Sequence, residues 1–296
     1  MQVLIIGASG YLGSAIASAL QRRGHTVLGT ARSDETARKL RETGIEPVSA
    51  DITMPASLRT PAEQSDAVVY AVQYDGDDQL LVEGAALRAI VAALAGSAKP
   101  FAYTSGVWIY GNTGDRVADE DSPLNPTPAA AHRPQLERTV LNGANDGARA
   151  FVIRPGDVYG AGGGLPAMWV QSVAEAGAVR YVGDGRNHWP TVHRDDLAEL
   201  YALALEHAQG GSIYNASDER AFTVAQMAEA ASYGAGCNGA IVEWPLEEAR
   251  QRLGPFADAL ALDSRVTARR ARETFGWATR STTILDDLRG GSYAES

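Results

Sequence analysis

The sequence predicts an α/β fold in which a doubly wound parallel sheet forms a first domain and a smaller α/β domain follows. Two observations predict this fold. Apolar runs of strand length alternate with segments of helical periodicity through the first half of the chain, and the first apolar run leads directly into the glycine-rich turn GASGYLG. Strands that alternate with helices form parallel sheets, because each connection crosses back over the sheet before the next strand begins.

The first domain is predicted to contain five strands joined by helices. The strands are expected at 2–6, 25–32, 46–51, 66–72 and 100–105. Apolar residues recur at helical spacing in the segments 14–24, 34–44 and 78–96. Gly24 and Gly44 stand where helices commonly end in a left-handed residue. In such a fold, ligands bind at the carboxyl edge of the sheet.

The chain after Arg154 is less regular and forms the predicted second domain. The segment 154–169 is rich in glycine and proline, and helices are expected within 172–208, 222–234 and 263–277, with Thr223 as an N-cap. We expect residues 1–155 to form the first domain and residues 156–296 mainly the second. The segment 188–216 is expected to return to the first domain.

The composition excludes several classes of protein. The 296 residues are 45% hydrophobic with a formal net charge of −10, and no run rich in Lys or Arg occurs. Nucleic acid and membranes are therefore not expected as partners. The single cysteine, Cys237, and the lack of Cys/His ligand spacing argue against a disulfide and a metal site. With no signal peptide and no apolar run of the roughly 20 residues that span a bilayer, we expect a cytoplasmic protein.

The turn GASGYLG predicts a dinucleotide-binding site of the Rossmann type. It follows a buried strand and opens a helix, so its glycines allow a tight turn, close approach of backbone N–H groups to a pyrophosphate, and close packing of helix on sheet. The alternative is a purely structural glycine turn, but the strand–turn–helix–strand context favours the cofactor. The predicted contacts are Gly7, Ser9, Gly10, Tyr11, Leu12 and Gly13.

The end of the second strand indicates NADP(H). An NAD site usually carries an acid there for the ribose 2′-hydroxyl, whereas this strand is followed by Arg32, whose guanidinium suits a 2′-phosphate. Asp34 and Glu35 leave NAD open as the alternative, although both are typical of the first turn of a helix. Asp51, after the third strand, is a candidate acceptor for the adenine amino group.

The chain resembles the extended short-chain dehydrogenase/reductase superfamily, the NAD(P)-dependent epimerase/dehydratase group, over nearly its whole length. The resemblance is carried by GASGYLG, Asp51, YAV at 70–72, YTSGVWIYG at 103–111, IRPGDVYG at 153–160, VGDGRNHWPTVHRDDLAELY at 182–201 and the terminal FGW. It implies a Rossmann domain, a C-terminal substrate domain and a homodimer formed through two long helices. It also implies an active site in which a Ser/Thr and a Tyr hold the substrate oxygen, while a Lys four residues after the Tyr lowers the phenol pKa.

The chain departs from that pattern at the positions that carry the chemistry. With Glu137 taken as the residue that follows the family's Tyr/Lys helix, the Tyr position falls on Ala129 and the Lys position on Arg133. No Tyr-x-x-x-Lys occurs anywhere in the sequence. The usual Ser/Thr position falls on Gly106, beside Ser105. The resemblance is therefore to an atypical member.

Replacement groups can be proposed from the same region. Arg133 is expected to bind the nicotinamide ribose or its phosphate, and His132 is a candidate acid/base near neutral pH. Pro134 leaves the register open, because it suits the first turn of a helix and pushes the residue before it out of the helical region. Ser105 and Tyr159 are the other catalytic candidates.

The resemblance implies further contacts. Cofactor contacts are expected from Ile52, Ala71, Val72, Pro155 and Val158. The residues themselves also suggest a substrate pocket that is aromatic rather than charged, formed by Gln73, Trp108, Trp169, His188, Trp189 and His193. Asp157 is a candidate local acid.

Three functions remain open from the sequence. The first is an NADPH-dependent reductase of a small, apolar or aromatic carbonyl, enone or imine, with a non-standard proton donor. The second is a redox-neutral nucleotide-sugar epimerase or dehydratase, which the missing Tyr/Lys pair disfavours, since transient oxidation of an alcohol needs a competent base. The third is a non-catalytic NADPH-binding sensor or regulatory protein. Fold does not decide among them.

Overall fold

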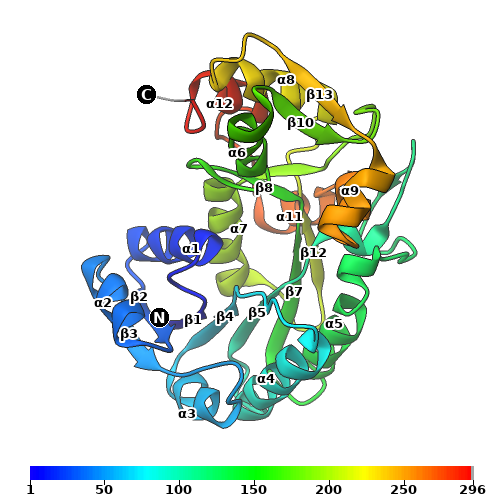
Figure 1. The fold of residues 1–296 in the computed structure, drawn as a ribbon. Coiled ribbons are helices and arrows are strands. Elements are labelled where there is room, and N and C mark those ends of the chain that lie inside the picture. The colour runs from blue at the N-terminus through cyan, green and yellow to red at the C-terminus, as the bar shows by residue number, and fades with distance from the viewer. Residues whose placement is uncertain (295–296) are drawn as a thin grey trace.

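A seven-stranded sheet forms the centre of the structure, a computed structural model that describes residues 1–294 apart from the side chains of residues 174–176 (Figure 1). The strand order is β12-β7-β5-β4-β1-β2-β3, and every neighbouring pair is parallel. The strands are β1 Gln2–Ile6, β2 Thr26–Ala31, β3 Glu46–Ser49, β4 Ala67–Tyr70, β5 Pro100–Thr104, β7 Arg149–Pro155 and β12 Ile213–Ala216. The predicted Rossmann-type fold is confirmed.

Helices cover both faces of this sheet, as the buried central strands require. On one face lie α1 Tyr11–Arg22, α2 Asp34–Glu42 and α7 Arg194–His207, and on the other α3 Ala56–Gln64, α4 Gln79–Leu94 and α5 Arg133–Asn142. Strand β1 shows the division. Val3 and Ile5 join the core cluster on the first face, and Leu4 and Ile6 join the cluster on the second, because successive side chains of a strand point to opposite faces.

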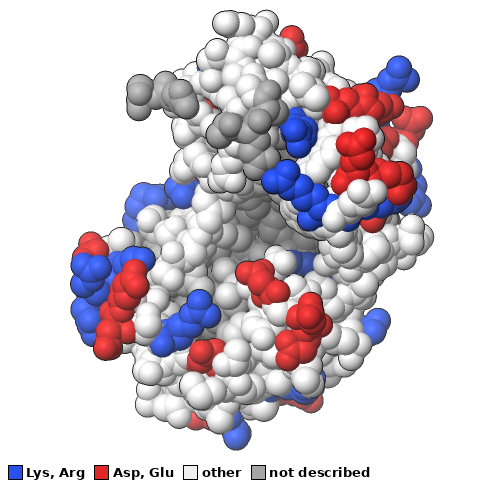
Figure 2. All heavy atoms as spheres, in the orientation of Figure 1, with Lys and Arg blue, Asp and Glu red and all other residues white. Residues whose placement is uncertain are grey.

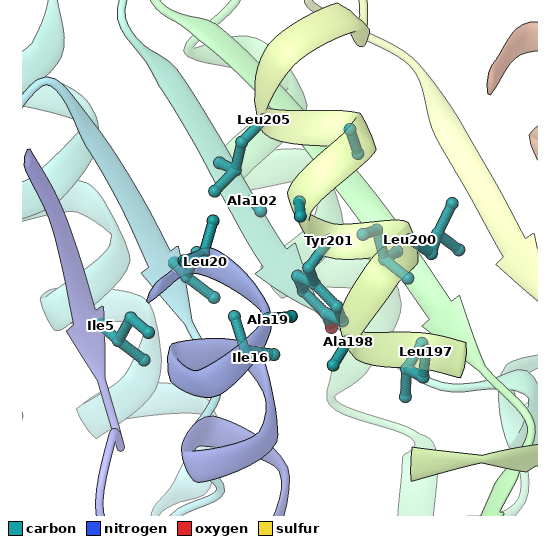
Figure 3. Packing of buried hydrophobic residues seen from close by; sticks show 14 of the residues in the cluster. Ile5, Ile16, Ala19, Leu20, Ala102, Leu197, Ala198, Leu200, Tyr201 and Leu205 are labelled. Carbon is teal, nitrogen blue, oxygen red and sulfur yellow. The ribbon is translucent and has the colours of Figure 1, made fainter. Parts of the chain in front are cut away.

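The pair formed by α1 and α7 brings distant parts of the chain together. Ile16, Ala19 and Leu20 of α1 lie against the helix that carries Ala198 and Tyr201, and all five side chains are buried (Figure 3). Small alanines on both helices allow this close approach. Since β12 follows α7 and pairs with β7, the segment 188–216 contributes a helix and an edge strand to the sheet layers.

Helix α3 is an element that the sequence did not reveal. It spans only nine residues and contains Pro61, which removes a backbone donor and lowers helix propensity. Leu58 and Ala62 are fully buried in the cluster that α4 shares. Tertiary packing therefore stabilises a helix that local propensity does not predict.

The C-terminal part packs around its own core cluster and lies above the sheet in Figure 1. Strand β8 Asp157–Gly160 pairs with β11 Thr191–His193 and β9 Gly163–Gly164, and β10 Val179–Val182 pairs with β13 Ile241–Trp244. Its helices are α6 Ala167–Ala176, α8 Val224–Gly234, α9 Leu246–Leu253, α10 Phe256–Leu260 and α12 Ile284–Gly290. The remaining elements are η1 Val107–Tyr110, β6 Val117–Ala118, η2 Pro128–Ala130, β14 Arg265–Val266 and α11 Arg269–Phe275.

Local signals for helix ends are confirmed. Thr223 caps α8 in a capping box with Gln226, in which each side chain accepts from the other residue's backbone N–H. Gly24 and Gly44 follow α1 and α2 with φ of 79° and 72°. Within residues 1–294, no helix has the length and apolar character needed to cross a bilayer.

A buried polar network joins four elements beside the carboxyl edge of the sheet. Arg154 at the end of β7 forms a bidentate ion pair with Glu137 of α5, with N···O distances of 2.9 and 2.6 Å. Arg154 also donates to the Tyr110 hydroxyl of η1 at 2.7 Å, and that hydroxyl donates to Asn215 of β12 at 2.8 Å. Both charged side chains are almost fully buried, so only this complete pairing offsets their desolvation.

We predict that Glu137→Ala lowers the free energy of unfolding by about 3–5 kcal/mol, because it leaves the Arg154 guanidinium buried and unpaired. Urea denaturation measures the change. The matched control is Glu42→Ala, which removes an exposed i,i+4 pair with Arg38 and is expected to change stability by no more than about 0.5 kcal/mol. Equal effects of the two substitutions would contradict the role given to the buried pair.

Candidate active site

The glycine turn between β1 and α1 has no room for larger residues. A β carbon on Gly13 would lie 2.0 Å from the Gly7 carbonyl oxygen, and one on Gly7 would lie 2.6 Å from that of Ala71. Gly7 also has a φ of +95°, in the region that favours glycine. The close approach brings the start of α1 onto the sheet edge. Gly10 is its N-cap and provides no side-chain cap, so the first-turn N–H groups remain available to a pyrophosphate.

A cavity of about 550 Å³, called here the cofactor cavity, begins at this turn. It lies at the carboxyl ends of the strands, and Figure 2 shows the molecule hollowed between the part that carries the sheet and the C-terminal part above it. Eight predicted cofactor residues line it, namely Gly7, Ser9, Gly10, Arg32, Asp51, Ile52, Ala71 and Val72. The glycine turn and this cavity together fit a dinucleotide.

Arg32 lies between the cofactor cavity and a neighbouring cavity. It lines the cofactor cavity and also an adjacent cavity of about 420 Å³, which Ser33 and Arg41 line as well. Among residues 1–294, Arg32 has no ion-pair partner, whereas Glu35 of α2 pairs with Lys39 at 2.7 Å. The strand end therefore offers a free guanidinium.

Asp51 lines the cofactor cavity in a fixed orientation. Its Oδ1 accepts from the backbone N–H and from the hydroxyl of Thr53, both at 2.9 Å. These bonds hold the carboxylate at the turn after β3, beside Ile52. The geometry is compatible with the predicted contact to an adenine amino group.

A second cavity of about 310 Å³, called here the reaction cavity, continues from the first and shares Ala71, Val72 and Gln73 with it. Arg133 lies on its wall, where the guanidinium donates to the Thr104 carbonyl at 3.4 Å and to Gln73 Oε1 at 3.3 Å. The helix begins at Arg133, so Pro134 occupies its first turn. Other predicted residues on this wall are Leu12, Ser105, Trp108, Pro155 and Val158.

Ser105 lies on the wall of this cavity and has an unused hydroxyl. It follows β5, where its backbone N–H donates to the Ile153 carbonyl at 2.8 Å. The side chain is buried, and its Oγ has no hydrogen-bond partner among the described residues. Buried polar atoms without partners are rare, so this hydroxyl is a natural contact for a bound polar group.

Asp157, which the sequence suggested as a local acid but not as a catalytic residue, is a functional candidate in the structure. It lines the reaction cavity, its Oδ1 accepts from the Trp108 indole N–H at 3.0 Å, and its Oδ2 has no partner within the described chain. Burial raises the pKa of its carboxyl to about 7, although the hydrogen bond from Trp108 opposes the rise. The signal in the sequence is an acid between Pro155 and Val158, both of which were predicted to contact the cofactor.

His132 does not reach the reaction cavity, contrary to its predicted catalytic role. It is the N-cap residue of α5, and its Nε2 is buried without a partner in the described structure. Burial and the neighbouring Arg133 lower the pKa of its imidazole to about 4. The ring is therefore neutral at pH 7 and holds no proton that it readily gives up.

Two phenols near the site, those of Tyr159 and Tyr110, form hydrogen bonds elsewhere, which also corrects the catalytic role predicted for Tyr159. Its hydroxyl donates to the Thr282 carbonyl at 2.8 Å, its ring packs in the C-terminal core, and burial raises its pKa. Tyr110 belongs to the buried Arg154 network, and burial raises its pKa to about 12. Neither residue lines the reaction cavity.

Tyr11 contributes its backbone rather than its side chain to the glycine turn. Its hydroxyl donates to the Gly160 carbonyl at 2.8 Å, and the Arg194 guanidinium lies over its ring at 5.3 Å. The side chain thereby joins α1 to the end of β8. This contact links the first turn of α1 to a strand of the C-terminal part.

The predicted aromatic residues do not form one substrate pocket. Gln73 and Trp108 line the reaction cavity, but Trp169 and Trp189 stack at 5.0 Å and line a separate cavity of about 180 Å³. His188 lines yet another cavity, and its imidazole forms a hydrogen bond with the Asp263 carboxylate. The Trp169–Trp189 pair belongs to the C-terminal core, where stacked rings bury a large apolar area.

Known proteins share this architecture. The model of the NAD dependent epimerase/dehydratase family matches residues 3–217. An uncharacterized protein of Schizosaccharomyces pombe is 30% identical over 99% of this chain and 100% of its own length. The 4-hydroxy-2-methyl-3-oxo-4-farnesyl-3,4-dihydroquinoline-1-oxide ketoreductase of Stigmatella aurantiaca is 28% identical over 74% of this chain and 68% of its own.

The fold similarity extends to a solved enzyme structure. The dTDP-glucose 4,6-dehydratase of Bacillus anthracis, in complex with NAD, superposes with a TM-score of 0.80 at 15% identity. The match covers 98% of this chain and 94% of that one. Identity at this level shows a shared fold.

We predict that Gly13→Ala weakens dinucleotide binding by roughly tenfold or more, because a displaced first turn loses a charge-assisted hydrogen bond of about 1.5–3 kcal/mol. Quenching of tryptophan fluorescence measures the affinity. Gly290→Ala is the matched control, since its added β carbon meets no atom within 4 Å. Unchanged affinity in a folded Gly13→Ala protein would remove the turn from the binding site.

Proposed function

Because the chain belongs to the NAD dependent epimerase/dehydratase family, we propose that it is an NADPH-dependent reductase of a small apolar or aromatic carbonyl, enone or imine. One observation carries the proposal. A continuous hollow runs from the free Arg32 guanidinium, past the glycine turn, to a small and mostly apolar cavity that contains the unpartnered Ser105 hydroxyl. The ketoreductase among the relatives supports the reaction type.

The choice of NADPH rests on the end of β2. Arg32 and the nearby Arg41 face an open cavity there, and Arg32 has no carboxylate partner among residues 1–294. A bidentate guanidinium contact suits a phosphate on the ribose. Thr30 at the strand end also lines the cofactor cavity in place of the acid that an NAD site would use.

The residues of the reaction cavity have distinct tasks in such a reduction. A bound nicotinamide dinucleotide supplies the hydride. The Ser105 hydroxyl donates to the substrate oxygen, and Arg133 holds the ribose side of the cofactor while it bonds to Gln73. The arginine does not act as a proton relay, because a guanidinium does not titrate in the working range.

The size and lining of the reaction cavity favour a small substrate. The cavity has a volume of about 310 Å³. It is lined in part by the segments Ala71–Val72 and Pro155–Val158, which are proposed to contact the nicotinamide and therefore leave only part of the volume for a substrate. The space left for substrate is bounded by apolar side chains, among them Val107 and Leu165. A compact carbonyl compound with an apolar or aromatic body suits this space.

A nucleotide-sugar substrate is less well supported. Its diphosphate needs cations, yet Arg133 is the one cationic side chain among the described residues that line the reaction cavity. Arg180 lies over the Trp244 ring beside another cavity, and Arg186 is exposed near Asp184. The buried Ser105 hydroxyl, which has no partner among the described residues and belongs to a residue on the wall of the reaction cavity, supports a polar ligand there and so favours an enzyme over a purely regulatory role.

We predict that Arg32→Ala weakens NADPH binding roughly 10- to 100-fold, as expected for the loss of charge-assisted hydrogen bonds worth about 1.5–3 kcal/mol. NADH binding is expected to change little. Fluorescence titration with each dinucleotide measures both constants. The matched control is Arg38→Ala, which removes an exposed guanidinium of α2 that lines neither cavity.

An equal loss for both dinucleotides, or none for either, would contradict the assignment of NADPH. The reductase itself is tested by NADPH consumption with a panel of small ketones, enones and imines. Tight NADPH binding without turnover of any member would favour the regulatory alternative.

A further inference from the structure

We propose that the Asp157 carboxyl is the proton donor of the reduction and that the Trp108 indole positions it. The proposal rests on the proposed reductase function and names the group that takes the place of the missing tyrosine. Asp157 opens β8 on the wall of the reaction cavity, and Trp108 of η1 lies on the same wall.

The two carboxyl oxygens of Asp157 differ in their hydrogen bonding. The Trp108 indole donates to Oδ1 at 3.0 Å, and an indole N–H can only donate, so it leaves the carboxyl proton free to sit on Oδ2. Oδ2 has no partner among the described residues, although it is buried. The carboxyl group is thus held by one oxygen, and the other oxygen has no protein partner among the described residues that would compete for its proton.

The surroundings keep a large fraction of the Asp157 carboxyl protonated near neutral pH. Among the described residues that line the cavity, Arg133 is the one cation. Its guanidinium donates to the Thr104 carbonyl and to Gln73. Arg154, at the end of the preceding strand, is neutralised by Glu137. The main influence on the Asp157 pKa is therefore burial, which raises it to about 7.

The titratable groups on the other elements packed against β8 are engaged elsewhere. His193 of β11 accepts from the Asp195 backbone N–H, and its ring lies against Tyr159 at 5.2 Å. Asp196 of α7 accepts from the backbone N–H groups of the segment 280–281, and Asp287 of α12 binds Ser292. These bonds leave Asp157 as the acid of the reaction cavity.

The proton transfer completes a balanced reduction. The substrate carbonyl carbon accepts a hydride from the reduced nicotinamide dinucleotide, and the π electron pair of the C=O bond moves to oxygen. That oxygen forms an O–H bond with the Asp157 proton as the carboxyl O–H bond breaks. The products are an alcohol, the oxidised dinucleotide and a carboxylate, which takes a proton from solvent before the next turnover.

The kinetic test uses Asp157→Asn, an isosteric change that keeps an acceptor for the Trp108 indole. We predict that kcat falls about 10²- to 10⁴-fold, the usual contribution of general acid catalysis, while NADPH affinity is unchanged. In the unmodified protein, kcat is constant at low pH and falls as the pH rises through about 7, because the donor must be protonated. The kcat of Asp157→Asn is expected not to show this decrease, which is called here the falling limb.

The positioning role of Trp108 has its own signature. The indole hydrogen bond holds the Asp157 pKa down, so Trp108→Phe is expected to raise that pKa and move the falling limb of the kcat profile to higher pH. A lower kcat with an unmoved limb would assign Trp108 to packing alone, and the positioning role would be overturned.

A readout that needs no turnover is the infrared absorption of the carboxylic acid. The difference between spectra at acidic and basic pH is expected to contain a band that vanishes in Asp157→Asn. Burial also raises the carboxyl pKa of Glu83, Glu120 and Asp218, so their bands persist in the variant and cancel on subtraction. A spectrum in which Asp157 is already ionised at pH 5 would overturn the proposal.

These readouts separate the inference from the function on which it rests. If no carbonyl, enone or imine is reduced, the proposed function fails, and the infrared titration still decides whether Asp157 holds a proton near pH 7. If substrates are reduced and Asp157→Asn retains both its rate and its falling limb, the reductase stands and the donor is another group.

Discussion

The buried ion pair between Arg154 and Glu137 is the interaction on which the geometry of the reaction cavity depends. Glu137 is one helical turn from Arg133, and Arg154 is three residues before Asp157. Through Tyr110 the same guanidinium reaches η1, which carries Trp108. One buried network therefore fixes three walls of the cavity. The complete set of hydrogen bonds matters, because a buried charge without its partner is strongly destabilising.

The two ends of the hollow obey different physical constraints. At the cofactor end, the contacts are backbone N–H groups and a helix start, and the lack of space at Gly7 and Gly13 explains why glycine is needed there. At the reaction end, the contacts are side chains whose protonation depends on burial. Replacement of residues at the reaction end therefore changes the chemistry without disturbing the fold that holds the dinucleotide.

Because the reaction end can change without loss of the cofactor site, the fold does not require a Tyr-x-x-x-Lys pair. A phenol needs a neighbouring cation before it can exchange protons near neutral pH, and in this chain Ala129 and Arg133 stand at those positions. A carboxyl group reaches a similar pKa from the opposite direction, since burial alone raises it. The proposed exchange of a phenol and a lysine for a buried carboxyl thus needs one group instead of two.

The sequence predicted the parts of this protein that local patterns specify. The strands from Gln2 to Thr104 and the glycine turn follow from apolar runs, helical periodicity and turn chemistry. Helix α3 was missed because packing on α4 outweighs Pro61. The burial of Asp157 and the separation of Trp108 from Trp169 depend on how distant segments pack, and the residue pattern does not encode that locally.

The most direct test of the central claim follows the hydride itself. NADPH that carries deuterium at both positions of C4 of the nicotinamide is incubated with the protein and a panel of small ketones, enones and imines, and the products are analysed by mass spectrometry. The account predicts a product with one deuterium at the former carbonyl, alkene or imine carbon for each NADPH oxidised. Deuterium that remains on the dinucleotide, with every substrate unchanged, would contradict it.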